Sequence, residues 1–240
     1  MSCSLITTWR RQDLQPLGGA VARGSVEQTT ILNWDDPGFD RFEVLHADTS
    51  SPGVEYLQQT HRWVQCNIRP VYALDDTQPA SVTLAKARGS CSQRLAVVEA
   101  LARQNGIPTK VEGLVLRGEF WYPRFRYTRH VVPDRVLLAW PSFRVDGEWI
   151  DASHAFTSGC DMSPKDFSNR GEETLFDVAA RSTITWGNQA SAGCLDLSRF
   201  VIRSLGTFDS RDDLFRSYGQ TLPWAVRTAL EPVFSRRAAR

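Results

Sequence analysis

One predicted helix, from Ser92 to Gln104, constrains the fold more than any other part of the chain. It contains neither Gly nor Pro and is dominated by Ala, Leu, Glu, Gln and Arg, the residues with high helix propensity. Ser90 stands just before it and is a residue type that caps helix N-termini. Gly106 and Pro108 follow the last turn and end the helix. The chain is therefore organised around a helix with well-defined ends.

Cys91 lies at the start of this helix, after a turn in which Gly89 permits a positive φ or a close approach. It begins one apolar stripe of the helix, which continues with Leu95, Val98 and Ala102. The free N–H groups and partial positive charge of a helix N-terminus stabilise a thiolate and can hold an oxyanion when sulfur attacks a carbonyl. Cys91 is thus either a nucleophile or, like most free cysteines, a small buried hydrophobic residue.

The composition excludes several classes of protein. The chain has 240 residues, enough for a substantial core, and its 28 basic and 27 acidic residues nearly cancel, which does not suggest a nucleic-acid partner. Its five cysteines are odd in number and form no CxxC motif, which argues against a disulfide framework or a zinc site and favours a reducing compartment. No apolar run approaches the length of a membrane span. We expect a cytoplasmic protein with no cofactor, no metal and no membrane contact.

The N-terminal third mixes short strands with helices. Runs of β-formers predict strands at Thr29–Trp34 and Arg41–Leu45, and apolar periodicity predicts helices at Val54–Cys66 and Pro79–Lys86. His61 lies on the apolar face of the first helix, so we interpret it as a core histidine.

An antiparallel meander follows the cysteine helix. Strands are predicted at Lys110–Leu116 and Arg135–Trp140, and Phe143–Val145 pairs with Glu148–Asp151 across the turn Asp146-Gly147, a strong hairpin signal. A helix followed by such a meander indicates an α+β fold.

The rest of the chain is predicted to be mostly helical, for example at Ser191–Leu205 and Ser210–Ser217. We expect one domain over residues 1–240. It divides into a catalytic core at about 68–156, N-terminal strands and a helix at 1–67, and a helical part at 163–240.

The segment Phe120–His130 interleaves aromatic residues with three arginines, Arg124, Arg126 and Arg129. Such a mixture suits a binding lip that stacks on a ligand and contacts anions. It equally suits a loop whose aromatic side chains cover the edge of the sheet while its arginines stay solvated.

The order of these parts resembles the transglutaminase-like core of the papain-like cysteine superfamily. The resemblance rests on the cysteine at a helix start, on Asn105–Pro108 at the helix end, and on the strands that carry Ala-Trp and Gly-x-Trp…Asp. It implies a cysteine nucleophile paired with a histidine on the second strand and an aspartate on the third. Asp151 matches the aspartate, whereas Leu138 stands where the histidine is expected.

Two histidines could replace the missing one. His130 precedes the second strand, on the side from which the family's base enters, and His154 follows Asp151 by three residues. We prefer His130, so the predicted site is Cys91, His130 and Asp151. Asp134 remains an alternative to Asp151.

The resemblance implies acyl transfer through a cysteine-linked intermediate. Within the family, the chain is most similar to the Dieckmann cyclases of tetramate antibiotic biosynthesis, which implies a carrier-protein thioester of a β-ketoamide as substrate and a tetramic acid as product. On this hypothesis the three arginines meet the carrier. The alternatives are a transglutaminase-like hydrolase or protease, an amide-forming acyltransferase, and a catalytically inactive binding module.

Overall fold

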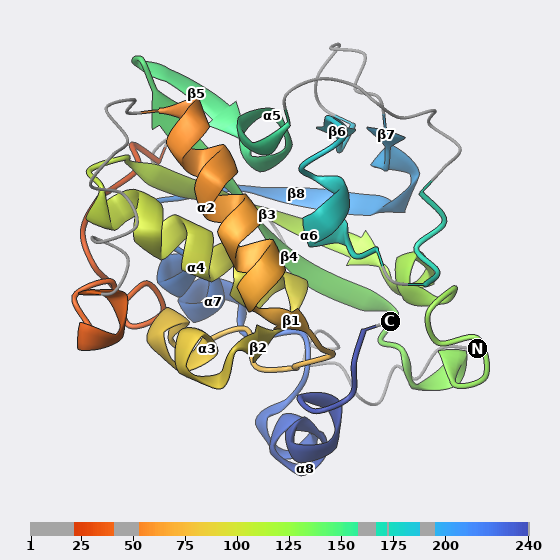
Figure 1. The fold of residues 1–240 in the computed structure, drawn as a ribbon. Coiled ribbons are helices and arrows are strands. Elements are labelled where there is room, and N and C mark those ends of the chain that lie inside the picture. The colour runs from red at the N-terminus through yellow and green to blue at the C-terminus, as the bar shows by residue number, and fades with distance from the viewer. Residues whose placement is uncertain (1–21, 41–52, 158–166, 172, 188–194, 240) are drawn as a thin grey trace.

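The computed structural model describes residues 22–40, 53–157, 167–171, 173–187 and 195–239 (Figure 1). The structure combines helices with a curled antiparallel sheet, which confirms the predicted α+β class. The sheet has four strands in the order β5-β4-β3-β8. None of the helices in these ranges is long and apolar enough to cross a bilayer.

The predicted meander forms the centre of the sheet. Strand β3 (Thr109–Arg117) pairs along its whole length with β4 (Arg135–Val145), and β4 turns into β5 (Glu148–Asp151). The residues of the connecting turn, Asp146 and Gly147, both have positive φ, 51° and 86°, as a two-residue type I′ hairpin requires. The hairpin prediction is confirmed.

The helix predicted at Ser191–Leu205 is wrong wherever this segment is described. Residues 201–208 form the strand β8 (Val201–Phe208), which pairs antiparallel with the outer edge of β3 and buries Leu205. The edge of β3 offers hydrogen-bond partners to the backbone of this segment. Tertiary pairing then overrides local propensity. Residues 191–194 of the predicted helix lie outside the described ranges.

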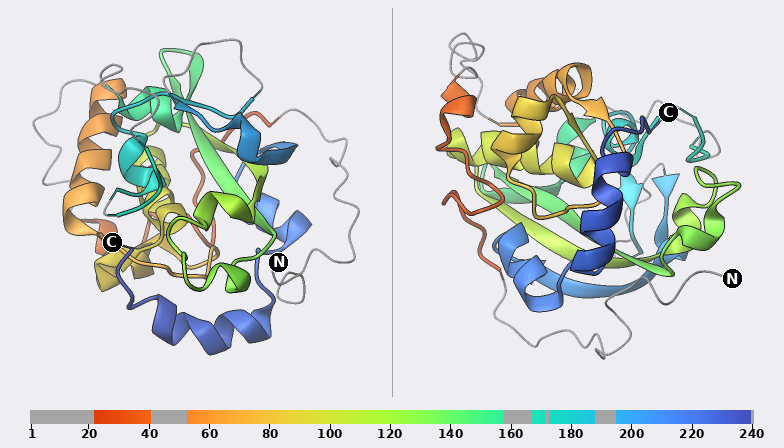
Figure 2. Two further views of the ribbon diagram at one scale, coloured as in Figure 1. Left: turned by 90° about the vertical axis from the view of Figure 1, so that its right-hand side faces the viewer. Right: turned by 90° about the horizontal axis from the view of Figure 1, so that it is seen from below.

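Helix α4 (Cys91–Gln104) is the central element, and every residue from Gln93 to Arg103 is buried. The sequence predicted one buried stripe, but this helix is enclosed on all sides. It packs against the sheet on one side and against α2 (Val54–Asn67) and α3 (Ala80–Lys86) on the other (Figures 1 and 2). The predictions of both neighbouring helices are confirmed.

The strand predicted at Thr29–Trp34 is wrong. This segment is made of turns, followed by the short 3-10 helix η2 (Pro37–Phe39). Its polar groups bond to a helix rather than to a sheet, because the hydroxyl of Thr29 and the backbone N–H of Ile31 both donate to the carboxylate of Asp212. The strand predicted at Arg41–Leu45 lies outside the described residues.

Short elements complete the fold. They are the parallel pair β1 (Arg69–Pro70) and β2 (Arg88–Gly89), α5 (Ala152–Phe156), α6 (Leu175–Val178), the parallel pair β6 (Ile184–Thr185) and β7 (Leu195–Asp196), α7 (Arg211–Tyr218), α8 (Trp224–Phe234), and the 3-10 helices η3 (Gly118–Trp121), η4 (Arg129–Val131) and η5 (Ser198–Phe200). In its described residues, the part at 163–240 predicted to be helical contains three α-helices but also three strands. Its helix at Ser210–Ser217 is confirmed as α7.

The C-terminal segment returns to the parallel pair. After α8, the carbonyl of Arg237 accepts the N–H of Tyr72, and the N–H of Ala239 donates to Pro70. Both bonds lie beside β1, whose partner β2 immediately precedes the cysteine helix. Residues 237–239 therefore extend this small sheet next to the start of α4.

Candidate active site

Cys91 is the first residue of a fully capped helix, as predicted. The Ser90 hydroxyl accepts the Gln93 N–H at 3.3 Å, and the Gln93 side chain accepts the Ser90 N–H at 3.1 Å. This reciprocal pair is a capping box. At Gly89 an added Cβ would lie 2.8 Å from a methyl carbon of Thr83, so the close approach expected at this glycine is present and the cysteine turn packs tightly on α3.

Cys91 opens into an apolar cavity of about 210 Å³. The cavity is bounded by the α4 N-terminus, the β1 segment, the η3 loop, strand β4, the α6 turn and the C-terminal segment. Apart from Cys91, its apolar lining residues include Tyr72, Leu74, Phe120, Trp121, Phe125, Val136, Leu137, Leu138, Leu175, Leu222 and Phe234. An apolar cavity of about 150 Å³ suffices to bind benzene. The volume here can hold an apolar group of comparable or greater size beside the sulfur.

Leu138 lines the same cavity as Cys91. Strand β4 therefore brings this position to the cavity that Cys91 lines. The side chain there is apolar and buried. No described residue that lines the cavity is a histidine.

Asp151 lies beside His154 rather than beside the cavity. Its carboxylate accepts the N–H and hydroxyl of Ser153 and caps α5, and it meets the Nδ1 of His154 at 2.5 Å. Asp151 is paired with Ser142 in the sheet, four residues along β4 from Leu138. At the rise of a strand this is a separation of roughly 13 Å. The structure thus joins Asp151 to His154 and places both away from the residues around Cys91.

His130 lies in η4 and is exposed. It is not among the cavity-lining residues, although Val132 and Pro133, just after it, are. Asp134 follows them, and its carbonyl accepts the N–H of Gly118 at 2.8 Å. His130 is therefore outside the cavity lining, two residues before lining residue Val132.

Asp76, in the loop before α3, lines the cavity together with Cys91 and was not found from the sequence. Burial raises its pKa to about 6, against the opposing effects of Ser92 and of the Arg211 guanidinium. The adjacent acidic pair at 75–76 was its only signal in the sequence. Such a pair is usually a solvated turn, so that signal did not distinguish it.

The aromatic and basic segment divides into two parts. Phe120, Trp121 and Phe125 line the cavity, as a binding lip requires. Arg124 lines the cavity as well. Its guanidinium donates to the Asn169 side chain at 2.6 Å and to the carbonyls of Gly171, Glu173 and Ala239. Arg126 and Arg129 remain exposed. One of the three arginines of the predicted lip therefore also joins separate parts of the fold.

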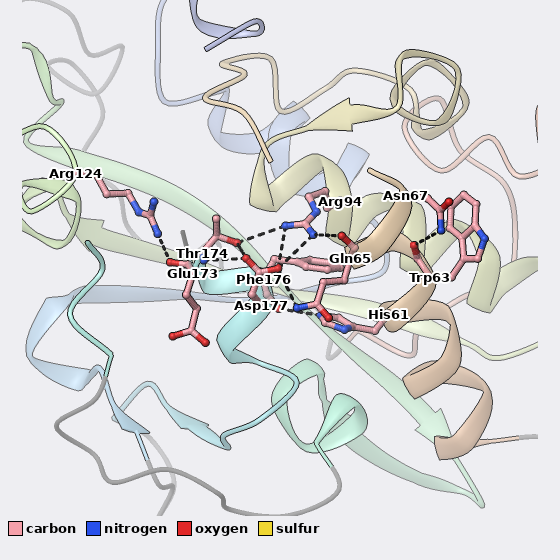
Figure 3. A network of polar contacts seen from close by, with 10 residues as sticks. All are labelled: His61, Trp63, Gln65, Asn67, Arg94, Arg124, Glu173, Thr174, Phe176 and Asp177. Carbon is pink, nitrogen blue, oxygen red and sulfur yellow. Dashed lines mark hydrogen bonds and ion pairs between the residues drawn. The ribbon is translucent and has the colours of Figure 1, made fainter. Parts of the chain in front are cut away.

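A buried polar network fixes the α6 turn that forms one wall (Figure 3). Arg94 of α4 stacks on the Phe176 ring at 4.1 Å and pairs with Asp177 at 3.3 Å. Although burial raises the pKa of Asp177, Arg94 and the hydrogen bonds from Thr174 hold it below its ordinary value. His61 of α2 is 1% exposed and bonds through Nε2 to the Phe176 carbonyl at 2.8 Å. The prediction of a core histidine is confirmed.

The remaining candidate ligands form no metal centre within the described ranges, since no group of three or more His, Cys, Asp or Glu side chains there could hold an ion. Of the five cysteines, Cys66 is exposed on α2 and Cys91 is half-buried, whereas Cys3, Cys160 and Cys194 lie outside the described residues.

Part of the chain is similar to a known family. Residues 44–153 match the family model described as the Transglutaminase-like superfamily. The match includes the cysteine helix and the β3–β5 meander.

Among solved structures, the chain is similar to one named "a Putative Cysteine Protease from Cytophaga hutchinsonii". The identity is 15% and the TM-score 0.40, and the match covers 52% of this chain and 39% of that one. The match thus spans about two fifths of the length of that protein. No curated protein matches the sequence.

Proposed function

We propose that the protein is a cysteine-dependent acyl-transfer enzyme in which Cys91 is the nucleophile. The observation that carries the proposal is the position of Cys91, as the first residue of a capped helix whose N-terminus opens into an apolar cavity. The free N–H groups of the helix N-terminus can hold the oxyanion of the tetrahedral intermediate. The cavity provides space for the acyl group that sulfur receives.

The cavity also supports a substrate class. Its lining is aromatic and aliphatic, with few polar side chains, which favours an apolar acyl group over a charged peptide side chain. A thioester on a carrier protein is one way to deliver such a group. Within this class we propose the reaction expected from the sequence, a Dieckmann cyclisation. In this reaction a carbanion of the bound β-ketoamide attacks the Cys91 thioester and releases a tetramic acid.

Intact-protein mass spectrometry tests the proposal. The protein is incubated with the N-acetylcysteamine thioester of a β-ketoamide, and wild type is compared with Cys91→Ala and with Cys66→Ala as a matched control. We expect an acyl adduct on wild type and Cys66→Ala and none on Cys91→Ala. Release of a cyclic product supports the cyclase, whereas an adduct that only hydrolyses supports a hydrolase or an amide-forming enzyme.

A second function, an inactive binding module, is favoured by one observation. Leu138 fills the position of the expected histidine and adds to the apolar lining. The binding module is supported over the enzyme by two results together. Thioesters leave no adduct on Cys91, and the free acyl amide binds to wild type but not to the variant with the bulky Leu138→Trp substitution.

A further inference from the structure

We propose that Asp76 is a catalytic residue that exchanges protons with Cys91 during acylation. The inference rests on the proposed function and concerns the same cavity. Among the described residues that line this cavity, Asp76 is the one carboxylic acid. It shares the cavity with Leu138, which occupies the position expected for the histidine.

The loop that carries Asp76 is tied directly to the cysteine turn. The Gln93 side chain, which completes the helix cap through its oxygen, donates through Nε2 to the Asp75 carbonyl at 2.8 Å. From the other side, the N–H of Asp76 donates to the Gln220 side chain at 2.9 Å. One glutamine therefore fixes both the first turn of α4 and the backbone next to Asp76.

The Asp76 side chain is held at the same end of the helix. Ser92, the residue after Cys91, lines the same cavity and lowers the pKa of Asp76 against the effect of burial. The Ser92 hydroxyl accepts from Arg211 at 3.0 Å, and Arg211 is bound in turn to buried Glu99 at 2.6 Å. The charged groups that act on Asp76 are Arg211 from α7, Arg227 from α8 and its neighbour Asp75. Glu99 offsets the charge of Arg211, so Asp76 is not locked into a simple ion pair.

This environment suits proton transfer near neutral pH. Burial raises the pKa of Asp76 to about 6, and acid–base groups work best when their pKa lies near the working pH. As Sγ of Cys91 bonds to the acyl carbon, its proton passes to the Asp76 carboxylate. When the bond from that carbon to the leaving group breaks, Asp76 returns the same proton to the leaving group. The base of the second half-reaction, predicted to be His130, is a separate residue.

The test measures the pH dependence of Cys91 alkylation by iodoacetamide, resolved by peptide mass spectrometry, in wild type, Asp76→Asn and Asp75→Asn. No acyl substrate is needed, so the result is independent of the proposed function. In wild type we expect the rate to rise through a step near pH 6, where the carboxylate becomes able to accept the thiol proton. Asp76→Asn should lose the step and react at least about tenfold more slowly at pH 7. Asp75→Asn keeps the step, moved to lower pH because a like charge has been removed.

The sign of the effect separates catalysis from electrostatics. If Asp76 only repels a thiolate, Asp76→Asn reacts faster than wild type, and the proposal is overturned. An unchanged profile overturns it too. Should Asp76→Asn fail to fold, the carboxyl of Asp76 is titrated by carbon NMR in wild type and in Cys91→Ala. A shared proton requires its pKa to move when the thiol is removed, and an identical titration in both proteins contradicts the proposal.

Discussion

His130 and Asp76 approach the cavity from opposite parts of the chain, and the proposed roles give them separable phenotypes. Asp76 lies within the lining, whereas His130 lies two residues before lining residue Val132. A group within the cavity can act on the thiol itself. His130, outside the lining, is better placed to act on the incoming nucleophile after acylation.

We therefore predict that His130→Ala forms the Cys91 adduct at the wild-type rate but releases it more slowly, by roughly 10²–10⁴-fold, the usual contribution of a general base. Time-resolved intact mass spectrometry of a single turnover measures both steps. His154→Ala is the control. Slow release in His154→Ala and Asp151→Asn, with normal release in His130→Ala, would assign the role of general base to His154, which is bonded to Asp151.

At this scale the sequence predicts the nucleophile but not its surroundings. Cys91 could be found because capping and helix propensity are local properties of adjacent residues. Asp76 could not, because burial raises its pKa against the opposing effect of Arg211, which lies more than a hundred residues away along the chain. Its chemistry arises from contacts that the fold creates.

Among the elements, α2 and α6 are joined through one imidazole. Burial lowers the pKa of His61 to about 4, and its Nε2 proton is held by the Phe176 carbonyl. Since an unfolded histidine titrates near 6.5, the stability contributed by neutral His61 is complete above pH 6.5 and is lost as the pH falls to 4. The difference between these two pKa values corresponds to about 3 kcal/mol of folding free energy.

We predict that His61→Gln, which keeps an N–H donor, removes this acid-side loss. The measurement is the free energy of unfolding by urea between pH 4 and 7. Asp76 acts in the opposite direction, because its raised pKa stabilises the fold as the pH falls from about 6. The informative quantity is therefore the difference between wild type and variant, and a difference that does not change with pH would refute the assignment.

Elements defined by local signals are predicted well, and elements defined by partners are not. The cysteine helix and the Asp146-Gly147 hairpin are encoded by residues within their own spans. Strand β8 exists because β3 offers a free edge, and the Thr29 segment is a turn because Asp212 binds its backbone and hydroxyl. Neither partner can be read from the segment itself.

Over the whole molecule, Arg124 links parts of the chain that are far apart in sequence. Its guanidinium bonds to residues 169, 171 and 173 and to Ala239, and so closes the cavity between the η3 loop and the C-terminal segment. These bonds are charge-assisted, and removing the donor leaves several acceptors without a partner.

We predict that Arg124→Ala lowers the free energy of unfolding by roughly 2–4 kcal/mol and exposes the peptide bonds around residue 237 to limited proteolysis. Arg126→Ala, in the same segment but exposed, should change neither property measurably. Equal effects of the two substitutions would show that the loss comes from the loop as a whole and not from the bonds of Arg124.

The return of residues 237–239 to β1 has a consequence for synthesis on the ribosome. The chain emerges from its N-terminus, so α4 and the β3–β5 meander can collapse long before the last residues are made. Phe234 and Ala239 line the cavity, and Ala239 bonds beside the strand that precedes the cysteine turn. A nascent chain that still lacks them carries Cys91 in a half-open cavity, so the thiol gains its finished surroundings only when translation has passed residue 239.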